Sequence, residues 1–149
     1  MKILRIIAYH LCQWTWGVVQ NLVGLAFFVL LKKTRVEIYH GAICSVYSAR
    51  PKSRLGCFAL GSFIFIRDNV AERDFSLIRV HEYGHTVQSL FFGPLYLLIV
   101  ALPSVIWAGF YNKHSARMAR SGVAYTSRFP ENSASRLGEK VTKNKAMHW

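Results

Sequence analysis

The sequence predicts a single α+β domain embedded in a membrane. Long apolar segments alternate with basic segments, which is typical of membrane proteins with cationic loops. Two segments rich in β-branched and aromatic residues lie between helical patterns and predict a small sheet. Hydrophobic residues make up 52% of the 149 residues and charged residues only 17%, below the roughly one quarter of soluble domains. The length is enough for one domain, residues 1–149.

The net charge of +12 has two interpretations. It suits either nucleic acid or the headgroups of anionic lipids. Lys and Arg are spread along the chain beside the apolar segments and are not gathered in one patch. This spread favours a lipid bilayer as the partner and argues against nucleic acid.

Residues 1–31 predict an N-terminal anchor helix. The run 14–31 contains eighteen residues without a formal charge, which is about the length that spans a bilayer. Gln20 and Asn21 lie near its centre and weaken the prediction. No cleavage site of small residues precedes Lys32, so we expect an anchor that is not removed.

Residues 35–66 predict a small antiparallel β-hairpin. Its two strands are expected in 35–48 and 57–66, with a turn between them that contains Pro and Gly. Both faces of the second strand are apolar, so we expect protein or lipid to cover them. Residues 59–66 could also form an edge to which an extended peptide adds as a further strand, although a simply packed strand is the favoured interpretation.

The remaining chain predicts helices around an interrupted apolar region. A helix is expected over 76–92, and Gly93-Pro94 should end it. Residues 94–111 are expected to form a hydrophobic segment that turns back, so that the region is a broken helical hairpin. Residues 112–149 form a basic tail, in which ENSASRLGEKV predicts a short C-terminal helix.

The motif HEYGH lies inside the expected helix 76–92. Positions i and i+4 share one helix face, so His81 and His85 can reach the same metal ion. Glu82 can polarise a water molecule and accept its proton. Gly84 would permit the close approach of a neighbouring strand. Zinc suits such a site because it keeps a position open for water and lowers the pKa of that water to about 7.

How strongly the motif indicates a metal site depends on the sequence around it. About one random chain in a hundred of this length would contain the pattern by chance. Here it lies in a helical pattern beside apolar segments, where ionisable clusters are usually functional. The alternative interpretation is two hydrogen-bonded histidines and a solvated glutamate at a helix end.

A site of this kind needs a third protein ligand. Glu131 is the best candidate, because it begins the predicted C-terminal helix. The other candidates are His40, His114, His148, Asp68, Glu72 and Asp74.

HEYGH followed by ENSAS resembles the gluzincin metallopeptidases. The resemblance is strongest to the membrane-bound group that includes the CAAX prenyl endopeptidases and their bacterial heat-shock relatives. It implies that Glu131, in the place of the Glu of ExxAD, is the third zinc ligand. Ala134 matches that motif, whereas Ser135 stands where the family has an Asp that braces the site. Residues 79–138 also resemble small bacterial membrane proteins in which HExGH is followed by QSxxxGPLYLL.

The position of Glu131 constrains the topology. If residues 87–110 crossed the membrane once, His85 and Glu131 would lie on opposite sides, so this segment must turn back. Segments 32–79 and 111–149 are both rich in Lys and Arg, and the positive-inside rule then places both in the cytoplasm.

The sequence thus predicts a zinc metalloendopeptidase in the membrane, with its active site facing the cytoplasm. Its substrate would be a peptide or a membrane protein. His81, His85 and Glu131 would bind zinc, and Glu82 would be the general base. Two alternatives stay open: a non-catalytic metal-binding membrane protein such as a sensor or assembly factor, and a basic membrane-surface interaction protein without metal. The candidates for stabilising an oxyanion are Tyr111, His114 and Tyr125.

Overall fold

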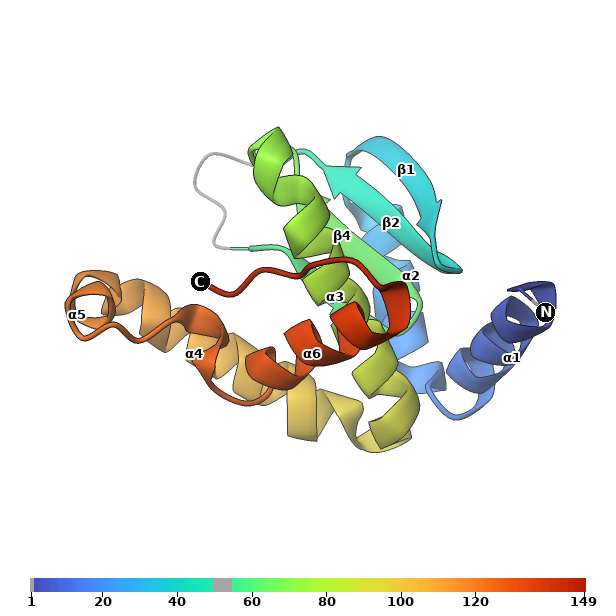
Figure 1. The fold of residues 1–149 in the computed structure, drawn as a ribbon. Coiled ribbons are helices and arrows are strands. Elements are labelled where there is room, and N and C mark those ends of the chain that lie inside the picture. Colours follow the sequence, from blue (N-terminus) through green and yellow to red (C-terminus); the bar gives the residue numbers. More distant parts are fainter. Residues whose placement is uncertain (1, 50–54) are drawn as a thin grey trace.

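The computed structural model describes residues 2–49 and 55–149. This part of the chain forms an α+β fold with six α-helices and one small mixed sheet, which confirms the predicted class (Figure 1). The elements in chain order are α1 (Lys2–Thr15), α2 (Val18–Leu30), β1 (Lys33–Tyr39), β2 (Ala42–Tyr47), β3 (Phe58–Leu60), β4 (Phe63–Arg67), α3 (Glu72–Phe92), the 3-10 turn η1 (Gly93–Leu95), the π-helical turn η2 (Leu97–Ala101), α4 (Leu102–Lys113), α5 (Ser115–Arg120), the 3-10 turn η3 (Tyr125–Ser127) and α6 (Glu131–Thr142).

The sheet has the strand order β1-β2-β4-β3 and is covered on both faces. On one face, Ile64 and Ile66 belong to a buried cluster with Tyr83 and Val87 of α3. On the other face, buried aromatic side chains of β2 and β4 pack against Phe27 and neighbouring residues of α2. Helix α6 lies against α3 on the side away from the sheet (Figure 1). The fold is therefore layered in the order α2, sheet, α3, α6.

The single hairpin predicted over 35–66 is wrong, because each expected strand is itself a hairpin. His40-Gly41 turns the chain between β1 and β2, and Gly61 begins the turn between β3 and β4. All three residues have positive φ angles (50°, 93° and 58°), which tight hairpin turns require. The two hairpins join through β2 and β4, which are parallel. The turn expected between the two strands falls mainly on residues 50–54, outside the described residues.

The single N-terminal anchor helix predicted over 1–31 is also wrong, because the structure has two helices in this segment. Helices α1 and α2 meet at Trp16-Gly17 with an angle of 96° between them. Gly17 suits this corner, since a Cβ atom there would lie 2.7 Å from the side-chain oxygen of Gln13. Within the described chain, no single helix has the length and apolar composition to cross a membrane. One bent pair, α1 with α2, reaches the required length and apolar composition when the two helices are taken together.

Buried amides explain why α1 and α2 fold back on the domain. Gln20 donates hydrogen bonds to Ser89 Oγ and Gly93 O of α3 and η1, and Asn21 Oδ1 accepts one from the backbone N–H of Ser62. On α1, Gln13 donates to Thr86 O and accepts from Ser89 Oγ. A buried amide without a partner costs about 1–3 kcal/mol, so these bonds hold both helices against α3, and those of α2 also hold it against the β3–β4 turn.

The break predicted at Gly93-Pro94 is confirmed, but the return is not made within 94–111. Helix α3 ends at Phe92, and η2 and α4 then run outwards to Lys113. The return follows α5, and Figure 1 shows the resulting arm extending from the body of the molecule. The returning segment packs along α4, since Trp107 Nε1 donates to Tyr125 O at 2.8 Å. The turn comes at Gly122, whose positive φ of 64° permits it.

Candidate metal centre

Helices α3 and α6 cross with their backbones in contact, and this contact builds the site. A Cβ atom on Gly84 would lie 1.8 Å from the carbonyl oxygen of Ala134, and one on Gly138 would lie 2.1 Å from that of Val80. Neither position has room for a side chain. Gly84 therefore does permit a close approach, but its neighbour is the helix α6 and not the predicted strand.

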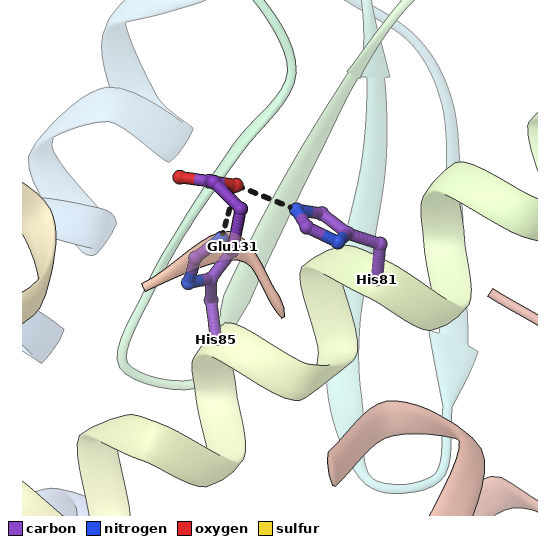
Figure 2. Close-up of side chains that lie close together, drawn as sticks. All are labelled: His81, His85 and Glu131. Atoms are coloured by element: carbon purple, nitrogen blue, oxygen red, sulfur yellow. Dashed lines mark hydrogen bonds and ion pairs between the residues drawn. The ribbon is translucent and has the colours of Figure 1, made fainter. Parts of the chain in front are cut away.

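The crossing brings His81, His85 and Glu131 together. Glu131 Oε2 lies 2.9 Å from Nε2 of His81 and 3.4 Å from Nε2 of His85 (Figure 2). One ligand atom from each residue lies within 4.8 Å of the others, and all three side chains are buried. In residues 2–49 and 55–149, no other group of three such residues is arranged to hold a metal ion. The alternative third ligands named from the sequence lie outside this group.

On both histidine rings, the Nδ1 atom faces a hydrogen-bond acceptor. Ser135 Oγ donates its single proton to Met147 O, so it can only accept from His81 Nδ1, which lies 2.9 Å away. Gln88 uses its amide nitrogen to donate to Pro130 O, and its oxygen lies 2.7 Å from His85 Nδ1. Both rings therefore carry a proton on Nδ1.

This leaves the Nε2 atom of each ring to face the carboxylate of Glu131. With Nδ1 protonated, each neutral ring presents a lone pair at Nε2. Two nitrogen lone pairs and a carboxylate oxygen then converge on one buried place, where a single cation can satisfy all three. The cation is either a proton on a ring or a metal ion. Two histidines and one carboxylate are a known ligand set of catalytic zinc.

In the metal-free protein, His85 holds this proton. Burial alone lowers its pKa, but the charge of Glu131 and the hydrogen bond to it raise the pKa to about 9. Burial lowers the pKa of His81. Burial raises the pKa of Glu131, but the charge of His85 and the hydrogen bond from its ring outweigh this effect and hold the pKa of Glu131 well below its usual range.

Glu82 lies beside the cluster and has an unsatisfied oxygen. The side chain is 4% exposed, and no described residue is a hydrogen-bond partner of its Oε2. Burial raises the pKa of Glu82 to about 8. A carboxylate with a pKa near neutrality is suited to accept and return a proton.

A cavity of about 1320 Å³ gives access to His81, Glu82, His85 and Glu131. Its walls come from α2, β3, α4 and the C-terminal segment. The sequence predicted a peptide-binding edge over residues 59–66. In the structure only the part of this segment in β3 lies at an edge of the sheet, because β4 is an inner strand. At this edge, Ala59 O accepts a hydrogen bond from Tyr96.

Of the three residues considered for an oxyanion, Tyr125 lies closest to the cluster. It lines the cavity and interacts with Glu131 and Ser104. Tyr111 also lines the cavity, but its hydroxyl donates to Val123 O. His114 is not among the residues that line the cavity, and its Nδ1 lies 2.9 Å from Phe110 O.

Sequence reasoning missed two residues that orient the side chains of the candidate metal centre. Gln88 orients His85, and its position three residues later on the same helix face was a usable signal. Ser104 of α4 donates a hydrogen bond to Glu131 Oε1. No sequence signal indicates this contact, since it depends on how α4 lies against α6.

Comparisons with protein-family models, curated proteins and solved structures returned no match to this chain. The class that the fold and site define is thus an α+β protein with a buried His-His-Glu cluster capable of holding a metal ion. This cluster does not by itself identify a gluzincin, and that relationship stays a prediction from the motifs.

Proposed function

We propose that this protein is a zinc-dependent peptidase. His81, His85 and Glu131 would hold the ion, and Glu82 would act as general base. The observation that carries the proposal is the convergence of three lone pairs on one buried place, with both Nδ1 atoms already committed to acceptors. The unpaired oxygen of Glu82 beside this cluster supplies the group that hydrolysis needs.

Zinc bound at this cluster would act as a Lewis acid and lower the pKa of a coordinated water to about 7. Glu82 would accept the proton of the attacking water and pass it to the leaving amine. Ser104 would hold the second carboxylate oxygen of Glu131 and so keep the first directed at the histidines.

The cavity suits a chain longer than a small metabolite. Its volume of about 1320 Å³ exceeds the range of roughly 300–1,000 Å³ that is usual for small-molecule pockets. Strand β3 forms part of its wall and is an edge strand, to which an extended peptide could pair through backbone hydrogen bonds. A peptide or a segment of a membrane protein is therefore the substrate class that we propose, at a site on the cytoplasmic side of the membrane.

The decisive experiment measures zinc content and peptide hydrolysis in wild-type protein and four variants. We expect one zinc per chain in the wild type, and its loss in His85→Ala and Glu131→Ala. Glu72→Ala is the matched control, because Glu72 is an exposed carboxylate in the first turn of α3, the helix that carries both histidines, and it is not part of the cluster. Glu82→Gln should keep the zinc and lose hydrolysis by a factor of about 10²–10⁴.

Each outcome separates the proposal from its alternatives. Zinc that survives Glu131→Ala would remove Glu131 from the ligand set. Zinc bound as expected, with no hydrolysis of a broad peptide library by the wild type, would favour a non-catalytic metal-binding protein. Wild-type protein without zinc after reconstitution would refute the metal centre and leave the surface-interaction protein.

A further inference from the structure

Helix α1 carries its apolar side on the outside of the molecule. Within residues 3–15 of this helix, the buried residues are Tyr9 and Gln13, and Gln13 bonds to Thr86 and Ser89 of α3. The opposite face is exposed and consists of Ile3, Leu4, Ile7, Leu11 and Trp14. In a helix on a water-exposed surface, this arrangement would be reversed.

Helix α2 has the same inverted arrangement. Its only buried residues are Gln20, Asn21 and Gly24. Its exposed large side chains are all apolar, namely Val18, Val19, Leu22, Val23, Leu25, Val29 and Leu30. The helix therefore buries its amides in protein and directs its aliphatic side chains outwards.

The arm continues this apolar exterior. Leu102, Ile106 and Phe110 share one exposed face of α4. The arm joins the corner of α1 and α2 at Trp16, whose ring packs so closely on Gly93 that a Cβ atom there would lie 2.2 Å away. Exposed apolar side chains of Phe91, Leu95 and Leu98 lie along the same join.

The charges around these helices are all of one sign. None of the seven acidic residues lies in 1–36 or 83–130, the two segments that contain α1, α2 and the arm. The same segments contain nine of the 19 Lys and Arg residues. Arg5, Lys32 and Lys113 lie on or next to the ends of the apolar helices.

We infer that the outer faces of α1, α2 and α4 form one lipid-facing surface, which seats the domain on an anionic bilayer. The aliphatic side chains enter the hydrocarbon, and the basic residues contact acidic headgroups. Each buried amide side chain of α1 and α2 makes at least one hydrogen bond inside the protein and is kept away from the outer face, as a lipid environment favours. A second copy of this chain is the weaker alternative, because two surfaces with the same positive charge repel each other. This inference does not depend on the metal centre.

The test compares aspartate variants of equally exposed residues in the full chain. Val19 of α2 and Val141 of α6 are each 45% exposed, but only Val19 belongs to the lipid-facing surface. Leu11→Asp, Val19→Asp and Ile106→Asp sample its three helices. Protein in mild detergent is diluted into vesicles of phosphatidylcholine, with or without phosphatidylglycerol, and bound protein is measured by sedimentation.

We expect each of the three variants to bind vesicles at least about tenfold more weakly than the wild type, and Val141→Asp to bind equally well. Phosphatidylglycerol should strengthen wild-type binding, and high salt should remove that gain. Circular dichroism and the unfolding temperature in detergent confirm that each variant is folded. Equal binding by all four variants, or a wild type that forms a dimer without detergent and ignores vesicles, would overturn the inference. The zinc content of the same preparations reports separately on the metal centre.

Discussion

The hydroxyl oxygen of Ser135 lies 2.9 Å from Nδ1 of His81 and gives its own proton to the carbonyl of Met147. Ser135 stands where the resembled metallopeptidases have an Asp. It makes the contact that orients the His81 ring, but it does so as a neutral acceptor and with the help of the C-terminal segment. The departure from the motif therefore leaves the bracing contact in place.

Replacing Ser135 should weaken the metal site without unfolding the protein. Ser135→Ala removes the acceptor for His81 Nδ1, so the ring loses its fixed orientation. Loss of such a contact typically lowers metal affinity by about 10–100-fold. Competition titration against a chelator measures this change. Ser127→Ala is the control, since the exposed hydroxyl of Ser127 bonds only to Ala124 O in the described structure. Equal affinities in both variants would show that Ser135 does not brace the site.

Replacing glycine by alanine should have opposite effects on stability at two positions, one inside the contact of α3 with α6 and one outside it. Gly84→Ala would drive a methyl group into the backbone of α6 at Ala134, where 1.8 Å is available. Overpacking typically costs about 1–3 kcal/mol, and the rigid backbone on both sides favours the upper end. Gly109→Ala on α4 meets nothing within 4 Å and should be neutral or stabilise by up to about 1 kcal/mol. Denaturant titrations in detergent measure both. A Gly84→Ala protein as stable as the wild type would mean that the helices do not cross so closely.

Zinc affinity should rise with pH up to about pH 9. The charge of Glu131 overcomes the effect of burial and raises the pKa of His85 to about 9, so below this pH an incoming ion must displace the proton on Nε2. One displaced proton gives an affinity gain of about tenfold per pH unit. Chelator competition at several pH values measures the slope. Glu82→Gln should retain the part of the slope that belongs to His85, and a flat profile in that variant would exclude His85 as the site of the proton.

Local chemistry explains which features could be predicted from the sequence. The i, i+4 spacing put His81 and His85 on one helix face, and Gly93-Pro94 ended α3 as expected. Glu131 was selected for its place on the predicted C-terminal helix and by the resemblance, and the structure does bring it to the histidines. Whether the cluster binds zinc, and whether the chain cleaves peptides at a membrane, remain proposals.

Long-range packing explains the errors. Helices α2 and α3 cover both faces of the sheet, so its inner strands are apolar on both sides. Their sequence then shows no regular alternation of apolar and polar residues, and a turn inside such a segment is hard to recognise. In the sequence, Gln20 and Asn21 only weakened the prediction of an anchor helix. Their partners Ser89 and Ser62 lie 69 and 41 positions away, so only the folded chain shows why α2 packs on the domain.

Glu82→Gln should stabilise the metal-free protein in alkaline solution. Burial raises the pKa of Glu82 from its ordinary 4.5 to about 8, so the folded state binds one more proton than the unfolded state between these values. Stability then falls as pH rises through this window, by up to about 1.4 kcal/mol per pH unit from this group. Gln stays neutral and avoids this loss, so its advantage should be absent near pH 4.5 and largest at pH 8 and above. Chelator-treated protein unfolded by denaturant at several pH values measures it.

Glu139→Gln provides the opposite case on the neighbouring helix. A hydrogen bond from the backbone of Ala146 and the contact with His148 hold the pKa of Glu139 below its usual value. Its carboxylate therefore stabilises the folded state above about pH 4.5, and replacing it should give no gain at any pH. If both variants responded alike to pH, the response would come from the change of net charge. A gain limited to Glu82→Gln would identify Glu82 as a buried carboxylate that binds a proton near neutral pH, which is the property required of the general base.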